Sequence, residues 1–255
     1  YRAPQAFDED MHIAIVGGKR VRIRLADDLK EERSHSVSLS ADLYHTFGKV
    51  QTNLLVEGFY TILDDVFALR DMDDAADGGK VKERYNGSGA TVRGFNVEGR
   101  AAFTRWFELQ AGVTLQQSRY REPEYWSEDA EVPPVRRMFR TPDAYGYFTA
   151  SFKPVRNFTA DLSGTCTGSM LVQHMAGSGV GQDVAVSTPS FFDMNIRLSY
   201  DVRIYKEITM QLYGGVQNLF NAYQKDFDKG VDRDSGYIYG PSLPRSWFVG
   251  AKFSF

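Results

Sequence analysis

Hydrophobic and polar residues alternate along most of this chain. Between Phe192 and Arg203, every second residue is apolar or aromatic, and the residues between them are polar or charged. A period of two is typical of a β-strand whose two faces meet different surroundings. The same alternation recurs in residues 34–47, 50–66 and 107–121, where no helical period of 3.6 competes with it. The chain is therefore predicted to be all-β.

The pattern predicts a series of long strands. They cover residues 34–47, 50–66, 89–104, 107–121, 140–153, 157–173, 190–204, 207–223 and 244–255. Many exceed the usual strand length of about 5–6 residues. They match or exceed the ~9–11 residues with which a tilted barrel strand crosses a bilayer.

The connections between these strands alternate in length. Short turns are expected at Gly48–Lys49, Arg105–Trp106, Pro154–Arg156 and Tyr205–Lys206, and long polar loops at 67–88, 122–139, 174–189 and 224–243. Outer-membrane barrels are built with short periplasmic turns and long extracellular loops. The alternation thus predicts a transmembrane antiparallel β-barrel, with its apolar face toward lipid and its polar face toward the lumen. The predicted lumen residues include Glu98, Arg100, Gln110, Asp193, Arg197 and Asp201.

Composition excludes several classes of protein. The net charge of −3 provides no basic field for nucleic acid. The single cysteine excludes an internal disulfide framework and a thiolate zinc cluster. Mean hydropathy is −0.38, and no run approaches the ~20 apolar residues of a membrane helix. Because the chain opens on Tyr1 rather than Met, we expect a further segment before it.

Several motifs resemble TonB-dependent outer-membrane receptors. The stretch GGVQNLFNAYQKDFDKG (214–230) resembles their penultimate strand and loop, and SLPRSWFVGAKFSF (242–255) resembles their final strand. YRAP (1–4) and the segment from Asp28 to Tyr44 resemble two conserved boxes of the family, although the second lacks the family's prolines. TGSMLVQHMAG (167–177) is similar to members from Bacteroidetes.

The resemblance implies a barrel of about 22 strands with a plug domain folded inside it. Residues 1–255 would form the C-terminal barrel segment, and the plug and the first barrel half would lie outside it. Implied partners are the plug, the TonB complex acting through the plug, outer-membrane lipid and the barrel-assembly machinery. The resemblance also implies that this machinery reads an aromatic signal in the last strand, at Trp247, Phe253 and Phe255.

The function implied is active import of a scarce nutrient, such as an iron-siderophore, heme or cobalamin, across the bacterial outer membrane. Two alternatives stay open. One is a free-standing small outer-membrane barrel, such as a protease or adhesin. The other is a soluble β-sandwich that binds a ligand.

Ligand-binding candidates lie in the predicted extracellular loops. They are His12, Tyr125, Trp126, Arg136, Arg137, Met138 and Tyr239. Aromatic side chains offer a large contact area with few rotors, and arginines offer forks for carboxylates or phosphates. His12 lies between the two boxes, where heme receptors of this superfamily place a histidine, and a neutral imidazole can bind heme iron.

No arrangement for catalysis or for a resident cofactor is expected. The four histidines are scattered without metal-site spacing. Two acidic segments, Arg70–Gly79 and Asp226–Gly236, resemble oxygen-rich Ca²⁺ loops in composition but lack the EF-hand pattern. Solvated surface loops are the favoured interpretation of both.

Overall fold

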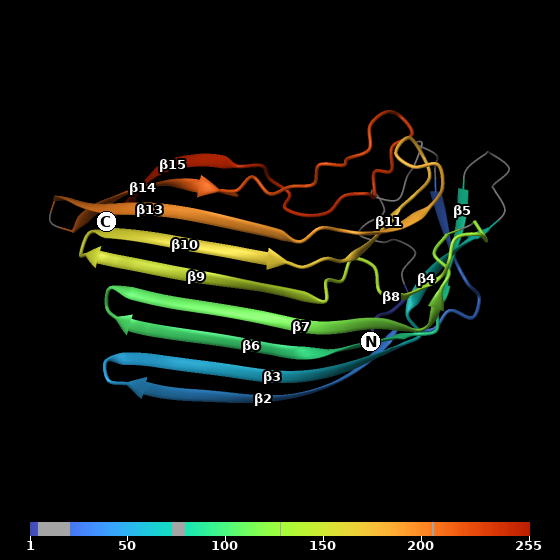
Figure 1. Ribbon diagram of the computed structural model, residues 1–255, viewed down its shortest axis with the longest axis horizontal. Coiled ribbons are helices and arrows are strands. Elements are labelled where there is room, and N and C mark those ends of the chain that lie inside the picture. Colours follow the sequence, from blue (N-terminus) through green and yellow to red (C-terminus); the bar gives the residue numbers. More distant parts are fainter. Residues whose placement is uncertain (5–20, 73–79, 128, 206) are drawn as a thin grey trace.

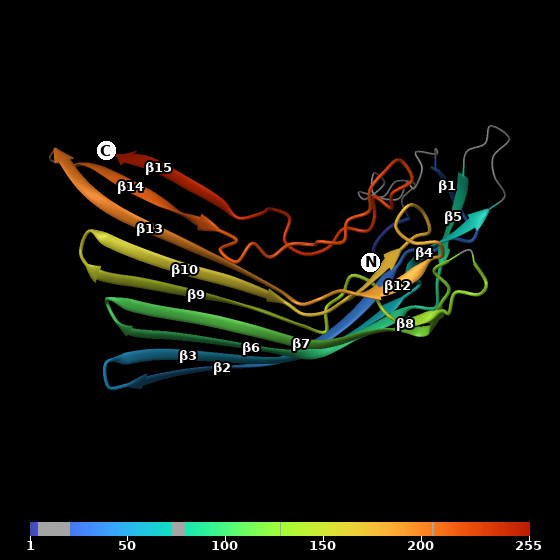
Figure 2. The ribbon, with the colours of Figure 1, turned by 45° about the horizontal axis from the view of Figure 1, so that its top comes forward.

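The computed structural model describes residues 1–4, 21–72, 80–127, 129–205 and 207–255. Its main feature is one curved antiparallel sheet with tight turns at one end and long loops at the other (Figures 1 and 2). The strand order is β15-β14-β13-β10-β9-β7-β6-β3-β2, with the short β8 paired to β7. The long strands on this path follow one another in sequence, as in a meander, with only short strands between some of them.

The long strands confirm the all-β prediction. They are β2 (Arg33–Phe47), β3 (Val50–Asp64), β6 (Ala90–Thr104), β7 (Phe107–Glu124), β9 (Ala144–Val155), β10 (Phe158–Thr167), β13 (Phe191–Tyr205), β14 (Ile208–Gln217) and β15 (Ser246–Ser254). The tight turns after β2 and β6 lie where they were predicted. The predicted turn at Pro154–Arg156 is wrong by one to two residues, because β9 continues through Val155.

Three predicted strand ends are wrong by several residues. Strand β10 ends at Thr167 rather than at residue 173, and β14 ends at Gln217 rather than at residue 223. Residue Asn218, directly after β14, has a positive φ of 48°, which a continuing strand does not allow. Strand β9 begins at Ala144 rather than at residue 140, and Arg140 also has a positive φ, of 55°.

Six short strands of the described chain, most of them in the predicted loops, lie outside the path of long strands. Strands β1 (Val21–Leu25), β5 (Lys80–Asn86) and β4 (Phe67–Met72) form a small sheet in which β1 and β5 are parallel. Strands β11 (Leu171–His174) and β12 (Val184–Ser187) form a hairpin, and β8 covers Val135–Arg137. Strand β1 precedes all predicted strands, and β11 overlaps the end of the predicted strand 157–173. Arg2 forms an isolated antiparallel bridge with Glu32, just before β2. These elements lie at the loop end of the main sheet (Figure 2).

The register places the two kinds of side chain on opposite faces of the sheet. Cross-strand partners share a face, and the pairs Asp161–Arg197 and Arg100–Gln110 confirm the predicted polar face. On the other face Leu39 is 82% exposed and Val113 is 44% exposed. A soluble sandwich would bury such residues in a closed interior, so this alternative is wrong.

The sheet is open. Strands β2 and β15 are its two edges, and they do not pair with each other in the described part of the chain. Within the same residues, no helix has the length and apolarity needed to cross a membrane.

Candidate functional site

Two long loops at the same end of the sheet share a small apolar core. One loop joins β10 to β13 and the other joins β14 to β15. Val172 and Phe191 pack there with Tyr237 and Tyr239, and all four are buried. Met170, Val186 and Ala222 surround them. The two loops therefore form one packed body rather than separate mobile segments. We call it the loop cap.

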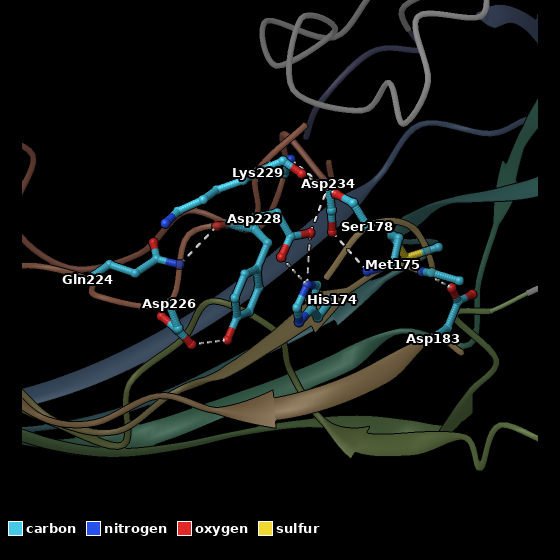
Figure 3. Close-up of polar contacts among 12 residues, drawn as sticks. His174, Met175, Ser178, Asp183, Gln224, Asp226, Asp228, Lys229 and Asp234 are labelled. Carbon is cyan, nitrogen blue, oxygen red and sulfur yellow. Dashed lines mark hydrogen bonds and ion pairs between the residues drawn. The ribbon is translucent and has the colours of Figure 1, made fainter. Parts of the chain in front are cut away.

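His174 is held from two sides inside the loop cap (Figure 3). Its imidazole lies flat on the ring of Tyr237, with centroids 3.7 Å apart and planes 4° apart. Its Nε2 lies 3.0 Å from both carboxylate oxygens of Asp228. The side chains of His174 and Asp228 are only 8% and 4% exposed. Because β11 ends at His174, this contact fixes the end of the short hairpin against the other loop.

Asp226 accepts hydrogen bonds from two phenols. The Tyr237 hydroxyl donates at 2.7 Å and the Tyr239 hydroxyl at 2.5 Å. Burial and the bond to Asp226 raise the pKa of Tyr239 to about 12, and the same causes raise the pKa of Tyr237. Burial acts to raise the pKa of Asp226, but the bonds from Tyr239 and Tyr237 outweigh it and lower that pKa. Near neutral pH the carboxylate is charged and both phenols donate.

Two further polar side chains of the cap form hydrogen bonds with backbone amides and carbonyls. The Asp234 carboxylate accepts from the Met175 amide at 2.8 Å and from the Gly236 amide at 2.7 Å. The Gln224 side chain donates to the Tyr237 carbonyl at 3.1 Å and accepts from the Tyr239 amide at 2.9 Å. Both side chains are buried. A loop without regular secondary structure thereby pairs its buried polar groups, as burial requires.

These contacts correct the interpretation of the acidic segment Asp226–Gly236. Asp228 and Asp234 are buried acceptors of hydrogen bonds within the cap, not solvated carboxylates. Among the described residues, no group of three or more histidine, cysteine or acidic side chains is placed to hold a metal ion. The other acidic segment, Arg70–Gly79, lies largely outside the described residues.

The candidates in loop 122–139 are placed next to the cap. Tyr125 is 76% exposed. Trp126 packs edge-on against Phe139 and donates its Nε1 to the Pro133 carbonyl at 3.3 Å. The guanidinium of Arg136 donates to the Arg121 carbonyl at 2.6 Å. Tyr125 and Arg136 are therefore the exposed candidates of this loop, whereas Trp126 serves its internal packing.

The other candidates differ in accessibility. Arg137 donates to the Ser169 carbonyl at 2.7 Å and pairs with Asp143 at 3.1 Å. Met138 continues the pairing with β7 through its amide, which donates to the Ser118 carbonyl. Tyr239 is 7% exposed, with its hydroxyl bonded to Asp226. His12 lies outside the described residues. Their contact with ligand stays a prediction.

Sequence reasoning missed the residues that build the cap. These are His174, Gln224, Asp228, Asp234 and Tyr237. It also missed Arg140, which donates to the Ile238 carbonyl at 2.9 Å and to the Gly236 carbonyl, tying loop 122–143 to the cap. The one available signal was composition, since carboxylates and tyrosines are dense between residues 223 and 239.

The lumen face of the sheet carries two clusters of hydrogen-bonded polar side chains. The Tyr147 hydroxyl donates to Glu98 at 2.5 Å, and Gln110 donates to Glu98 at 2.8 Å. Farther along the sheet, Gln211 donates to Asp201 at 2.9 Å and accepts from Arg197 at 3.1 Å. Such a surface suits water or a polar domain inside the barrel, not a hydrophobic core.

Comparison with known protein families shows which family this sheet belongs to. Residues 1–219 match the family described as TonB dependent receptor-like, beta-barrel. The chain belongs to this family. As a TonB-dependent receptor barrel it is an outer-membrane protein, and the members that it matches are receptors and transporters rather than enzymes.

Solved structures share the fold at low identity. The ferric-catecholate import receptor Fiu of E. coli matches with a TM-score of 0.60 and 17% identity, over 89% of this chain and 28% of that chain. A mutant of the ferric enterobactin receptor PfeA of Pseudomonas aeruginosa matches with a TM-score of 0.58 and 15% identity, over 90% and 32%. The FrpB iron transporter of Neisseria meningitidis matches with a TM-score of 0.55 and 15% identity, over 90% and 32%.

The chain thus spans about a third of the length of these TonB-dependent receptor structures. A search of curated proteins found no match.

The motif that carried the resemblance has a structural role in this barrel. Asn218, in the Asn-Leu-Phe-Asn run, is buried, and its side chain donates to the carbonyls of Ala222 and Leu243 at 2.9 and 2.8 Å. Its side-chain oxygen accepts from the Ala222 amide at 2.8 Å. Asn221 accepts from the Arg245 amide at 3.0 Å. The two asparagines connect the end of β14 to the start of β15 across the intervening loop.

Proposed function

We propose that this chain is part of a receptor that imports a scarce nutrient across the outer membrane by TonB-dependent active transport. The observation that carries the proposal is the family match together with a sheet that is polar on the lumen face and apolar outside. The solved structures named above include receptors for ferric catecholates and ferric enterobactin. An iron-siderophore, heme, cobalamin or similar compound is therefore the proposed class of ligand.

The proposal includes the organisation of the whole receptor. Residues 1–255 would form the C-terminal segment of a larger barrel, with other strands pairing with the edges β2 and β15. The plug domain would sit against the polar clusters of the lumen face and connect the barrel to the TonB complex. The segment Thr167–Gly177, which contains His174, supports a Bacteroidetes-like origin.

In this mechanism the receptor performs no chemistry on its ligand. The ligand would bind from outside between the loop cap, the neighbouring loop with Tyr125 and Arg136, and the plug. His12 is proposed as a heme ligand only in the case that heme is the nutrient. The barrel-assembly machinery would recognise the aromatic residues Trp247, Phe253 and Phe255 of the last strand.

The test uses cells that carry the complete receptor gene or its deletion. Uptake of radiolabelled iron-siderophores, heme and cobalamin is measured with and without a protonophore, which removes the energy supply of the TonB complex. We expect one compound whose uptake needs both the gene and the proton gradient, while surface binding survives the protonophore. Uptake that continues without the gradient would contradict energy-coupled transport.

The loop candidates are tested in the same cells. Tyr125→Ala combined with Arg136→Ala should weaken surface binding of the transported compound, because both side chains are exposed at the loop end. Thr149→Ala, on the lumen face of β9, is the control. Equal binding by the two variants would remove Tyr125 and Arg136 from the site.

A further inference from the structure

The stretch of residues 224–229 directs alternate side chains into the loop cap. Gln224 donates to the Tyr237 carbonyl, and Asp226 accepts from the Tyr237 hydroxyl. Asp228 contacts the imidazole of His174. No residue of this stretch has a positive φ, and the backbone makes no turn or sharp bend within it. The stretch is therefore extended, and the residues between these three side chains point to the opposite side.

Lys225, Phe227 and Lys229 form this opposite side. All three are exposed, Phe227 to 46%. In the part of the chain that the structure describes, neither lysine forms an ion pair. Alternate residues of an extended strand lie about 6.5–7 Å apart, so each ammonium group can reach the edge of an anion that lies on the ring between them. We call these three residues the Phe227 face.

The acidic composition of this loop does not extend to the Phe227 face. The Asp226 carboxylate accepts from two phenols, and the Asp228 carboxylate lies against the imidazole of His174. Asp234 accepts from two backbone amides. Because these three carboxylates form their bonds inside the cap, the two lysines are the charged groups on the outward side of residues 224–229.

The Phe227 face is directed toward the lumen. Phe191, which belongs to the cap core, lies six residues before Arg197 on β13, and an even separation places both on the lumen face. The cap therefore rests on the inner side of the barrel wall. In Figure 3, Lys229 lies above Asp228 and away from the strand drawn below His174. The side of the stretch that points away from the cap core thus looks into the mouth of the barrel.

A ring between two ammonium groups complements an aromatic anion. The face of an aromatic side chain stacks on another ring system, and a lysine ammonium group donates to carboxylate or phenolate oxygens. An aliphatic compound would leave the ring without a stacking partner, and a neutral compound would not pair with the lysines. The Phe227 face therefore discriminates by both charge and aromaticity.

We propose that the Phe227 face binds the transported compound through an aromatic part that carries at least two acidic groups. The aromatic part stacks on Phe227, and its acidic groups accept hydrogen bonds from Lys225 and Lys229. Porphyrin carboxylates and catechol phenolates share this chemistry. The inference rests on the proposed function and deepens it, because it selects aromatic anions among the compounds that the receptor could import.

The test uses the complete receptor, purified in mild detergent. Four probes are offered separately, and binding is measured by fluorescence quenching. They are protoporphyrin, its uncharged dimethyl ester, ferric enterobactin as a catecholate, and ferrichrome as a neutral aliphatic ferric chelate. We expect the wild type to bind protoporphyrin or ferric enterobactin, and to bind the ester and ferrichrome roughly tenfold more weakly, the combined effect of two lost charge contacts. The arms of the test thus distinguish a porphyrin from a catecholate.

Three variants separate the parts of the Phe227 face. Lys225→Gln with Lys229→Gln should weaken binding of the aromatic anion about two- to fivefold for each lysine removed. Lys225→Arg with Lys229→Arg keeps both charges and should retain most of the affinity. Phe227→Leu should weaken binding without changing its dependence on salt, because the charges stay in place. Lys49→Gln with Lys153→Gln removes two exposed lysines near the tight turns and is the matched control.

Three outcomes would overturn the proposal. They are a wild type that binds neither aromatic anion, equal affinity for the anion in the wild type and the double glutamine variant, and tighter binding of the ester or ferrichrome than of the anions. Energy-dependent uptake is measured in cells with the same variants. Absence of such uptake in wild-type cells would contradict the proposed function, whereas the affinities of the purified receptor would still decide the role of the Phe227 face.

Discussion

His174 and Tyr237 stack face to face, 3.7 Å between ring centroids, although they belong to different extracellular loops. Asp228, which lies on the same loop as Tyr237, accepts from the edge of the imidazole. The loop cap is therefore assembled from both loops at once. A change in one loop should loosen the other.

Asp228→Ala tests this coupling. The substitution removes the carboxylate that both His174 and the Asp234 amide contact, so those polar groups lose their partner. We expect a local destabilisation of about 1–3 kcal/mol, seen as faster hydrogen exchange in residues 171–176 as well as 226–237. Asp232→Ala, an exposed position of the same loop, should leave exchange unchanged. Faster exchange in the mutated loop alone would argue against a shared cap.

The second prediction concerns the titration of Tyr239. Its raised pKa means that the protonated phenol is favoured in the folded cap. This contribution to stability is complete below the ordinary pKa of about 10 and is lost as the pH rises through about 12. Phenolate absorbance, compared with Tyr239→Phe, should show the late titration. In the variant Asp226→Asn, the pKa of Tyr239 should fall toward its ordinary value. An unchanged titration of Tyr239 would contradict the idea that the bond to Asp226 helps to raise this pKa.

The contribution of Asp226 to the stability of the cap depends on pH in the opposite direction. Its lowered pKa means that the charged carboxylate stabilises the cap above the ordinary aspartate range. That contribution is lost as the pH falls through the folded-state value. The loop cap should therefore be most stable at pH values above the titration of Asp226 and below the titration of Tyr239.

The sheet could be predicted from the sequence, whereas the cap could not. In β2 and β3 the alternation of side chains sets both the strand and its face, because the lipid and lumen surroundings differ at every step. Strand ends were less predictable, since Asn218 stops β14 through its own backbone conformation and side-chain bonds. Contacts such as His174 with Tyr237 join residues far apart in sequence, and no local pattern marks them.

The third prediction tests the assignment of the faces. Val113 lies on the lipid face of β7, in a row with Val97 and Val56, and Thr149 is exposed on the lumen face of β9. Val113→Arg should cost roughly 2–4 kcal/mol of folding free energy in lipid vesicles, and Thr149→Arg close to nothing. Equal costs at the two positions would mean that the faces are assigned wrongly.

The fourth prediction concerns Asn218. Asn218→Gly keeps access to the positive φ of 48° but removes the side-chain bonds to Ala222 and Leu243. Each buried group left without a partner costs about 1–3 kcal/mol, so the loop between β14 and β15 should open more often and become sensitive to proteases. The backbone of Asn221 also has a positive φ, which glycine can adopt. Asn221→Gly therefore removes only one side-chain hydrogen bond, the one accepted from the Arg245 amide. It should therefore have the milder effect, and the reverse order would contradict the role given to Asn218.

The last prediction separates membrane energetics from recognition by the assembly machinery. Phe253 pairs with Met210 on the lipid face of β15, and Ser254 pairs with Thr209 on the lumen face. Near the interface a charge on the lipid face costs only about 0–1 kcal/mol, so Phe253→Glu should fold into vesicles almost as well as Ser254→Glu. If the machinery reads Phe253, the amount of Phe253→Glu receptor in outer-membrane fractions should nevertheless fall several-fold. Equal amounts of the two variants in cells would show that the aromatic residue acts only as a membrane anchor.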